Sequence, residues 1–473
     1  MRKLVAILLF VISANNLFSQ KIVCDNPYIS DAFRLAVNTV DINTRRGVLA
    51  AGGDYGGEWV RDIAINSWNG VSLIRPKVAE QSMWSVTIKK DTIGHQYWDK
   101  IIWVIAAYNH FQATGDQAFL KQAYICSANT MNQLEKRVFD NTYGLFNGPS
   151  VFNDGIAGYP ESILEAGNYS SGALENKNTA HIKCLSTNCV YFGAYLALIQ
   201  MGTILHADAT EINNFKSKAE SLKGNIVKYL YNKDNNTLNY LIDHLGATDK
   251  SQEGLGISFA VMFGVIEGGK AKQLIEHAFV SKYGITSIYP DFKRFSPEKP
   301  GRHNDIIWPM VNGYFAKAAI VSGNYNSFSS ELLNLTHLAL DEDKGNYNFW
   351  EIYNPYSGKP DGGYQVAGKD NPDHHWASCR YQTWSATAYI NMVYYGLAGI
   401  RLENDKISFS PYLPEYIHSL QLSEIPYCGS VLNIILKGSG NRIKTFSVNG
   451  KLQANHSINS LTKGLNEIAI ELE

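Results

Sequence analysis

The sequence has no excess of charge of either sign. Among 473 residues, 42 Lys and Arg stand against 43 Asp and Glu, which gives a formal net charge of −1 at pH 7. A nucleic-acid-binding protein would carry a basic patch, and a peripheral membrane protein a polybasic segment. We therefore expect no nucleic-acid partner, and the balance of charge favours a neutral ligand.

Long apolar runs are also lacking. No segment offers about 18 consecutive uncharged apolar residues, so no membrane span is expected. A shorter apolar run, residues 4–12, follows Arg2 and Lys3 and precedes a polar stretch that ends near Gln20. This order is typical of a secretory signal peptide, which we place at residues 1–20. The mature protein is therefore expected in the periplasm or outside the cell.

Cysteine is scarce, and the six cysteines do not form a metal-binding pattern. No His stands at ligand spacing from Cys184 or Cys189, so we expect no metal site and no other cofactor. In an exported protein these two residues could form a disulfide, and buried free thiols are the alternative. Cys24 offers a site for lipid tethering, but Val23 is bulky where lipoprotein cleavage needs a small residue.

The hydrophobic period predicts twelve helices, which a long irregular segment at 140–187 interrupts. That segment is rich in Asn, Gly, Ser and Pro, as functional excursions of compact domains often are. Six helical hairpins closed into a double ring, an (α/α)6 toroid in an otherwise all-α domain, would give this pattern. The predicted helices are 27–40, 59–74, 77–89, 97–114, 116–138, 188–206, 210–232, 253–265, 268–282, 305–322, 325–341 and 382–398.

After Gly399 the apolar residues alternate with period two, which predicts strands. Asn449-Gly450 fits the turn of a hairpin. We therefore expect a helical domain at 21–400 and a small C-terminal antiparallel β module at 401–473. The predicted strands are 406–410, 431–436, 443–448 and 467–472.

Aromatic residues make up 12% of the chain, with nine Trp and 28 Tyr. Such side chains stack well on sugar faces, but they also fill large helix interfaces. Each of five tryptophans is a candidate sugar platform and equally a candidate packing anchor. These are Trp59, Trp98, Trp308, Trp350 and Trp376.

Cleavage of a glycosidic bond commonly needs two carboxyl groups, so acids in aromatic, Gly-rich loops are of interest. The first such cluster, residues 56–62, ends in Arg61 and Asp62 at a predicted helix start. A carboxylate accepts two hydroxyl protons and Arg donates in a fixed fork, which suits the binding of sugar hydroxyls. A structural salt bridge, or an acid that favours the first helical turn, is the alternative.

The second cluster lies in the irregular segment and contains Asp154 between Phe152 and Ile156. Apolar surroundings would raise the pKa of Asp154 and favour the protonated form that a general acid requires. An ordinary Asp-Gly turn is the alternative. Glu161 and Glu165 are the next candidates for the acid.

The third cluster, residues 348–361, places Glu351 between Trp350 and Tyr353. A carboxylate between two aromatic rings suits a base that activates water beside a bound sugar. Asp361 and the Asp-His-His-Trp stretch at 373–376 could line the same pocket. For the two His we favour a solvated loop, because adjacent His side chains rarely face one ion.

Two further stretches resemble pocket walls. Residues 301–309 place basic, polar and aromatic groups, among them His303 and Trp308, directly ahead of a predicted helix. Residues 96–99 do the same with Trp98. Both stretches are therefore candidates for binding substrate.

Together these clusters resemble the six-hairpin glycosidases, most closely the group of glycoside hydrolase families 63 and 37, which includes α-glucosidases and trehalases. The Arg-Asp element is also similar to glucoamylases and glycogen-debranching glucosidases. The resemblance spans about residues 45–400. Its motifs, in order, are Trp-Val-Arg-Asp at 59–62, the Asp154 loop, Ile-Trp-Pro-Met-Val-Asn at 307–312, Phe-Trp-Glu-Ile-Tyr-Asn-Pro at 349–355 with Ser-Gly at 357–358, and Gln-Thr-Trp-Ser at 382–385.

The resemblance implies an inverting, exo-acting α-glycosidase that acts on an oligosaccharide or polysaccharide, with an α-glucosidic preference. It makes Asp154 the general acid and Glu351 the general base, and it implies no cofactor. The terminal sugar would contact Arg61, Asp62, Trp308 and Trp350, with the other aromatic and His candidates nearby. The acid loop departs from the family pattern, because Phe-Asn rather than Ser-Gly precedes Asp154.

Three alternatives stay open. An α-L-rhamnosidase-like enzyme would also join a toroid to a C-terminal β module. A polysaccharide lyase can use the same toroid with Tyr, His and Arg, but a lyase acting on uronic acids would need a basic cleft, and the charge is balanced. A glycan-binding protein without activity is the third, and two well-placed acids argue against it.

Overall fold

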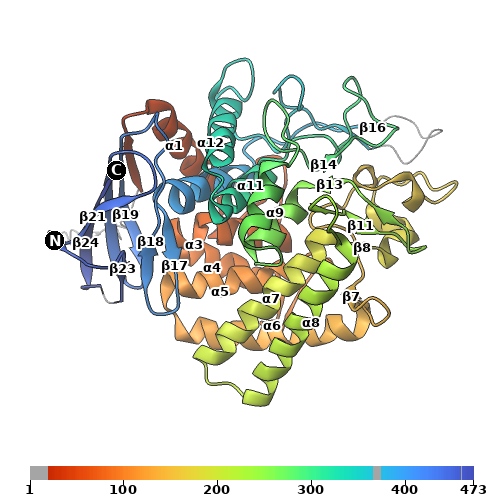
Figure 1. Cartoon of the computed structure of the whole chain (residues 1–473), viewed down its shortest axis with the longest axis horizontal. Helices are drawn as coiled ribbons and strands as arrows, with labels where there is room; N and C mark the ends of the chain where they lie inside the picture. Colours follow the sequence, from red (N-terminus) through yellow and green to blue (C-terminus); the bar gives the residue numbers. More distant parts are fainter. Residues whose placement is uncertain (1–19, 366–373, 460) are drawn as a thin grey trace, which may run out of the picture.

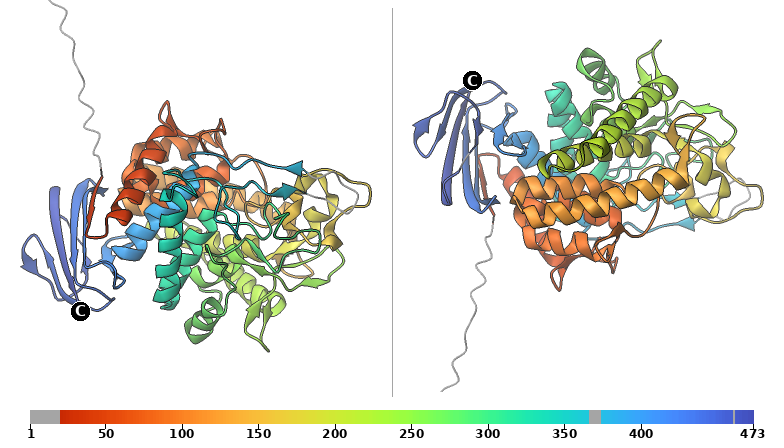
Figure 2. Two further views of the ribbon diagram at one scale, coloured as in Figure 1. Left: turned by 90° about the horizontal axis from the view of Figure 1, so that it is seen from above. Right: turned by 90° about the horizontal axis from the view of Figure 1, so that it is seen from below.

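A computed structural model of the chain describes residues 20–365, 374–459 and 461–473. A helical body is followed by a β module that lies against one side of it (Figures 1 and 2). Residues 1–19 lie outside the described residues, so the signal peptide and export remain predictions. In the part of the chain that is described, no helix is both long and apolar enough to cross a membrane.

Each of the twelve predicted helical segments contains a helix. The segments at 59–74 and 382–398 each include a π-helical turn, at Ser67–Val71 and Met392–Leu397, and the first is kinked at Gly70, whose φ of 160° and ψ of −26° are not helical. The bounds are α1 Pro27–Ile42, α2 Val60–Asn66, α3 Ser72–Ile74, α4 Pro76–Ser85, α5 Ile102–Thr114, α6 Gln117–Val138, α7 Leu185–Ile204, α8 Ala209–Leu230, α9 Gly254–Met262, α10 Gly268–Glu276, α11 Pro309–Ser322, α12 Tyr325–Leu340 and α13 Thr383–Asn391.

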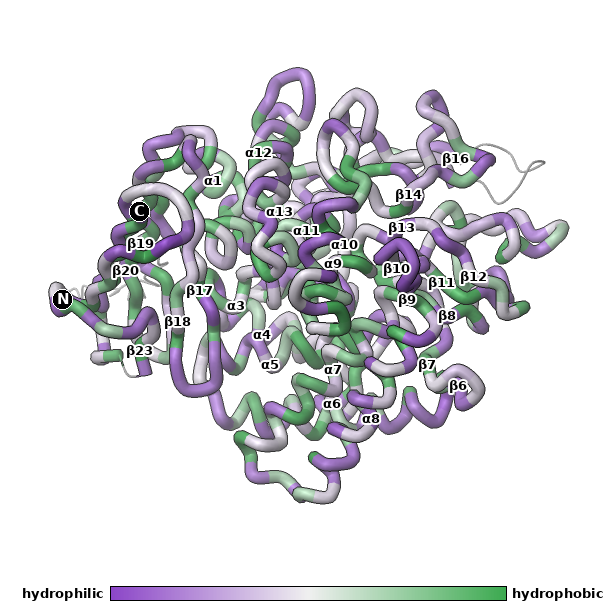
Figure 3. The backbone as a smooth tube through the Cα atoms, viewed as in Figure 1, coloured by the Kyte–Doolittle hydropathy of each residue, from purple (hydrophilic) through white to green (hydrophobic). Residues whose placement is uncertain are grey.

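Six helices form a closed inner ring. Helix α2 packs on α5, α5 on α7, α7 on α9, α9 on α11, α11 on α13, and α13 returns to α2. Helices α1, α4, α6, α8, α10 and α12 form the outer ring. The inner helices are apolar on nearly all sides, as in α7, whereas outer helices such as α8 carry one apolar stripe and many hydrophilic residues (Figure 3). The predicted (α/α)6 toroid is confirmed.

The ends of the helices follow local signals in the sequence. Asp116 and Asp208 cap α6 and α8 by accepting hydrogen bonds from backbone N–H groups of the first turn. Helix α11 begins with Pro309 and ends at Gly323, whose φ of 76° suits the left-handed conformation of a C-cap. The long loops precede the inner helices, so they gather at one end of the ring.

The β module contains two sheets. The larger has the strand order β1-β19-β20-β24-β21-β22, and the smaller has the order β17-β18-β23. The turn at Asn449 and Gly450 joins β21 to β22 with positive φ at both residues, as predicted. The bounds are β1 Lys21–Cys24, β17 Ile400–Leu402, β18 Ile407–Phe409, β19 Ser419–Tyr427, β20 Ser430–Lys437, β21 Ile443–Val448, β22 Lys451–Leu452, β23 Ser457–Ile458 and β24 Gly464–Leu472.

Two features of the module differ from expectation. The purely antiparallel arrangement was wrong, because β24 inserts between β20 and β21 and runs parallel to β20. Period-two alternation locates strands but does not give their order or direction. In addition, β1 from the start of the described chain pairs with β19, from Lys21 opposite Ser423 to Cys24 opposite Leu420. The larger sheet is thus mixed and includes residues from both ends of the described chain.

Candidate active site

A pocket of about 320 Å³ opens at the end of the toroid where the inner helices begin. Its walls come from residues directly ahead of α2, α11 and α13, from the long segment between α6 and α7, and from the loop between α12 and α13. Eight residues selected from the sequence line it. They are Trp59, Arg61, Asp62, Asp154, His303, Trp308, Glu351 and Trp376.

Trp98 was expected to contact substrate but does not line the pocket. Its ring is 1% exposed, and its Nε1 donates a 3.0 Å hydrogen bond to the carbonyl of Ser150. The side chain therefore anchors the loop that carries Asp154. An aromatic residue ahead of a helix has the same sequence signature whether it faces the pocket or supports it.

Trp350 and Tyr353, which flank Glu351, also lie outside the pocket lining. Nε1 of Trp350 donates to the Gly345 carbonyl at 2.9 Å, and the hydroxyl of Tyr353 donates to the Asn348 carbonyl at 3.1 Å. Both side chains are thus engaged by backbone carbonyls of their own loop. Their predicted contact with the sugar is therefore corrected to a role in folding the loop.

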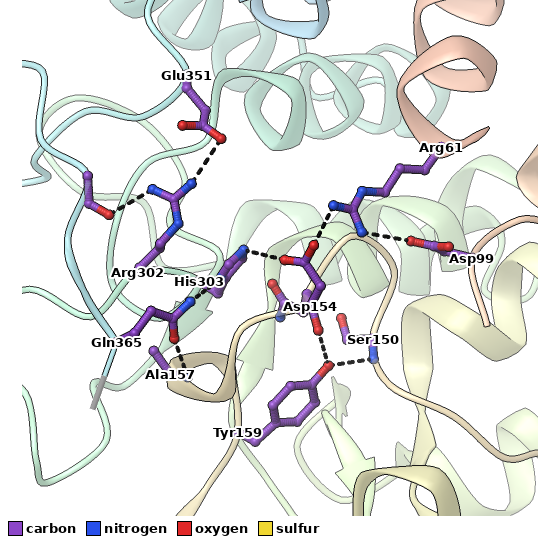
Figure 4. Close-up of polar contacts among 12 residues, drawn as sticks. Arg61, Asp99, Ser150, Asp154, Ala157, Tyr159, Arg302, His303, Glu351 and Gln365 are labelled. Atoms are coloured by element: carbon purple, nitrogen blue, oxygen red, sulfur yellow. Dashed lines mark hydrogen bonds and ion pairs between the residues drawn. The ribbon is translucent and has the colours of Figure 1, made fainter. Parts of the chain in front are cut away.

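Arg61 lies between three carboxylates. Figure 4 shows two of them, Asp99 and Asp154. Its Nη2 is 2.6 Å from Oδ2 of Asp154, its Nη1 is 3.4 Å from Oδ2 of Asp99, and its Nε is 3.8 Å from Oδ2 of Asp62. Arg61 and Asp62 lie in the first turn of α2, and Asp99 precedes α5. One buried guanidinium thus balances three acids, and the group is short of positive charge.

The protonated form expected for Asp154 was wrong. Burial pushes its pKa upward, but the charge and hydrogen bond of Arg61 outweigh burial and hold the pKa below its usual value. The side chain of Asp154 is 37% exposed and faces the pocket. Burial instead raises the pKa of Asp62 to about 7 and that of Asp99 to about 6.

Glu351 is held from several sides. Its Oε1 accepts a hydrogen bond from Nη2 of Arg302 at 3.0 Å, and its Oε2 accepts from the hydroxyl of Tyr55 at 3.1 Å and from the backbone N–H of Cys379 at 3.3 Å. Burial, then the charge of Glu351, raises the pKa of Tyr55, so this phenol stays protonated and donates. Asp154 and Glu351 thus come from separate loops, each paired with its own arginine (Figure 4).

The loop that carries Asp154 is strained. Phe152 has a φ of 59°, which is unfavourable for a bulky side chain, and its ring packs edge-on against Trp308 with centroids 5.0 Å apart. The hydroxyl of Tyr159 accepts from the backbone N–H of Ser150 at 3.0 Å and donates to the carbonyl of Asn153 at 2.6 Å. These contacts turn the carboxyl of Asp154 into the pocket.

His303 completes the surroundings of Asp154. Its φ is 76°, its ring stacks on Trp308 with centroids 4.8 Å apart, and its Nε2 lies 3.5 Å from Oδ1 of Asp154. Burial lowers the pKa of His303 to about 3, so the ring is neutral near pH 7. Nε2 of Gln365 lies 3.1 Å from Nδ1 of the ring.

Several pocket residues were not selected from the sequence. Arg302 lay in the stretch 301–309, but only its neighbours His303 and Trp308 were chosen. Tyr55 precedes the first cluster by one residue, and Gln365 follows the third cluster by four. A wider window around each acid would have included Tyr55 and Gln365. Residues 382–385 were named as a motif, and Gln382 and Trp384 from it do line the pocket.

The other acids and the two His lie outside the pocket lining. Glu161 pairs with Arg294, and Glu165 accepts from Asn168. Asp361 accepts a 2.8 Å hydrogen bond from Nε2 of the exposed His375. Asp373 lies outside the described residues, and among those described no group of three or more His, Cys, Asp or Glu could hold a metal ion.

Comparison with known protein families gives a match over most of the helical domain. Residues 82–385 match the model of the mannosylglycerate hydrolase MGH1-like glycoside hydrolase domain. This range includes both loops that carry Asp154 and Glu351. No curated protein sequence matches the chain.

Solved structures share the fold. The mannosylglycerate hydrolase of family GH63 from Thermus thermophilus, in complex with glucose, superposes with a TM-score of 0.60 at 15% identity, over 76% of this chain and 98% of that one. A structure named "Sialidase", without a stated organism, superposes with a TM-score of 0.69 at 16% identity, over 92% of this chain. A GH78 rhamnosidase of Bacillus sp. GL1 superposes with a TM-score of 0.57 at 14% identity, over 88% of this chain. The chain spans 40% and 41% of the length of these last two proteins.

Proposed function

The chain belongs to the family of mannosylglycerate hydrolase MGH1-like glycoside hydrolases, and on this premise we propose that it is an inverting, exo-acting α-glycosidase with a preference for α-glucosidic bonds. Asp154 is the general acid and Glu351 the general base. The observation that carries the proposal is that these two acids, from separate loops, line one pocket. Inversion requires the two carboxyl groups to stand roughly 6.5–9.5 Å apart with a water between them.

The environment of Glu351 supports the role of base. Its three hydrogen-bond partners Arg302, Tyr55 and the N–H of Cys379 all donate, so the carboxylate faces them as an acceptor. A base of this kind takes a proton from the attacking water while its partners fix its orientation. Trp308 and Trp376, whose ring centroids lie 5.1 and 5.4 Å from the guanidinium carbon of Arg302, form apolar walls for a sugar ring.

The group around Arg61 supports the role of Asp154 as acid. Asp62, Asp99 and Asp154 share one cation, and the raised pKa values of Asp62 and Asp99 keep a proton within this group close to neutral pH. A sugar hydroxyl that engages Arg61 weakens the contact of Arg61 with Asp154. The pKa of Asp154 then rises, and the carboxyl becomes able to protonate the leaving oxygen.

The charges of the pocket favour a neutral sugar over a uronic acid. Within the described residues that line it, Arg61 and Arg302 are paired with carboxylates and His303 is neutral. No cation of this lining is left to bind a sugar carboxylate. A lyase that acts on uronic acids would need one, so the proposal of a hydrolase is favoured over that alternative.

The test is hydrolysis of a panel of α-linked glucosides, mannosides and rhamnosides, with the anomer of the product followed by NMR. We compare the wild type with Glu351→Gln and with Glu220→Gln, a control at an exposed site on α8. The proposal predicts an inverted product from glucosides, loss of activity in Glu351→Gln only, and lower rates on the other sugars. Preferential release of rhamnose would favour the rhamnosidase-like alternative, and a retained anomer would contradict the mechanism.

A further inference from the structure

The side-chain amide of Gln365 has a defined orientation. Its Oε1 accepts a 2.9 Å hydrogen bond from the backbone N–H of Ala157, and its Nε2 lies 3.1 Å from Nδ1 of His303 (Figure 4). A backbone N–H can only donate, so the oxygen end of the amide must face Ala157. The NH2 end therefore faces His303, and Nδ1 of the ring acts as the acceptor.

This contact determines which nitrogen of His303 carries the proton. The ring is neutral near pH 7 because burial lowers its pKa, so it holds a single proton. Since Nδ1 accepts from Gln365, that proton is on Nε2. Nε2 faces Oδ1 of Asp154 at 3.5 Å, and stacking on Trp308, at an angle of 19° between the rings, holds the imidazole in this orientation.

The adjacent backbone leaves just enough room for the arrangement. A Cβ atom at Gly155 would lie 1.8 Å from Nε2 of Gln365 and 2.5 Å from Nδ1 of His303. Any larger residue beside Asp154 would therefore push the amide and the ring apart. The contact between Gln365 and His303 thus depends on the absence of a side chain at this position.

We propose that Gln365 is a positioning residue that fixes the proton of His303 on Nε2 and thereby keeps Asp154 ionised while the pocket is empty. The inference rests on the proposed role of Asp154 as general acid. With Nε2–H facing Oδ1 and Arg61 facing Oδ2, both oxygens of Asp154 face donors. The opposite tautomer, with a bare Nε2, would instead accept a hydrogen bond from the protonated carboxyl of Asp154 and favour its neutral form. The acid thus takes up its proton only when substrate displaces one donor.

The first test reads the tautomer directly and does not depend on activity. Long-range ¹H–¹⁵N spectra of protein labelled with ¹⁵N-histidine distinguish the two neutral forms, and the His303→Phe variant identifies the signals of His303. We expect the Nε2–H form in the wild type from pH 5 to 8. Gln365→Glu retains an oxygen for Ala157 but presents an acceptor to Nδ1, so it should yield the Nδ1–H form or the imidazolium. An Nδ1–H ring in the wild type, or unchanged His303 signals in Gln365→Glu, would overturn the proposal.

The second test is the pH profile of kcat, whose limbs reflect the ionising groups of the enzyme–substrate complex. In Gln365→Glu the added carboxylate favours a charged His303, which lowers the pKa of Asp154, so the alkaline limb should move to lower pH by about 1 unit. Gln112→Glu makes the same change of charge at a residue outside the pocket, where Nε2 of Gln112 donates to the carbonyl of Leu402, and it should leave the profile in place. An equal shift in both variants would contradict the inference. If the wild type hydrolyses no glycoside while the tautomer shifts as expected, the role of Gln365 toward His303 stands and the role of Asp154 fails.

Discussion

Arg61 donates from Nη2 to Oδ2 of Asp154 across 2.6 Å, in a pocket where Asp62 and Asp99 compete for the same guanidinium. In the proposed mechanism, this relationship links the binding of sugar hydroxyls to the protonation of Asp154. On that proposal, a substrate that takes up the donors of Arg61 changes the charge balance around Asp154. The predictions below follow from this group and from its supports.

Arg61→Lys should lower kcat/KM by about 100-fold, because an ammonium group cannot keep the forked contacts to Asp154 and Asp99. The charge is retained, so the fold should survive, and circular dichroism with thermal unfolding checks this. Arg34→Lys, at an exposed pair with Asp31, is the control and should behave as the wild type does. Wild-type kcat/KM in Arg61→Lys would remove the guanidinium from the mechanism.

Asp154→Asn should reduce kcat by roughly 10²- to 10⁴-fold on glycosides whose leaving group needs a proton. On α-glycosyl fluorides the loss should be much smaller, because fluoride departs without general-acid assistance. The ratio of rates on the two substrates is the measurement. An equal loss on both would mean that Asp154 binds or orients the sugar and does not protonate the leaving group.

Tyr55→Phe should lower kcat/KM by roughly 10- to 100-fold, since a hydrogen bond to a charged group contributes about 1.5–3 kcal/mol. The hydroxyl removed is 3.1 Å from Oε2 of Glu351, and the ring itself remains. Tyr347→Phe, at an exposed Tyr on another loop, is the matched control. The product anomer should stay inverted in both variants, and a retained anomer in Tyr55→Phe would contradict the assignment of Glu351 as base.

Trp98→Phe and Trp376→Ala should separate a supporting ring from a ring that contacts sugar. Trp98→Phe leaves the carbonyl of Ser150 without its donor, so it should destabilise the protein by about 1–3 kcal/mol with little change in KM. Trp376 is 37% exposed at the pocket, so its removal should raise KM with little change in the melting temperature. Thermal unfolding and steady-state kinetics measure both, and the reverse pattern would return Trp98 to the substrate site.

The protein should be more stable near pH 5 than near pH 8. Glu331 is buried between α11 and α12, where burial raises its pKa to about 7 against a usual value of 4.5. A folded-state pKa above the unfolded value means that its stability contribution is complete below about pH 4.5 and is lost as pH rises through 7. For Glu331 alone the change is on the order of 3 kcal/mol.

The variant Glu331→Gln tests this pH dependence of stability at a site outside the pocket. The amide does not ionise, so calorimetric melting temperatures of this variant should fall less between pH 5 and 8 than those of the wild type. Glu220→Gln, at an exposed site, should follow the wild type. A steeper fall in Glu331→Gln than in the wild type would show that the buried carboxyl is stabilised in its charged form.

Much of the fold could be predicted because each helix is a local pattern. The inner helices have apolar residues on all faces and the outer ones carry a stripe, so all twelve segments were found. The parallel pairing of β20 with β24 could not be predicted, since it depends on which strand returns beside which. The strand β19 was also missed, because a register shift between Leu422 and Ile425 interrupts its alternation.

The site was predictable at the level of loops and less so at the level of side chains. Asp154 and Glu351 were selected from their neighbours in sequence, and both line the pocket. The pKa direction of Asp154 was missed because Arg61, which determines it, lies 93 residues away in sequence. Trp350 and Tyr353 were selected because they flank Glu351 in sequence, but they bond carbonyls of their own loop. Tyr55 and Arg302, from distant parts of the chain, contact Glu351 instead.

The pairing of β1 with β19 makes the β module a discontinuous domain. Its first strand precedes the toroid and its other strands follow it, so no single cut in the chain can separate the two parts cleanly. A truncation after residue 400 would leave β1 as an unpaired edge, and processing directly before Cys24 would remove three of the four residues of that strand. In protein engineering terms, the toroid is an insertion within the β module, and the two should be expressed, transplanted or fused only as one unit.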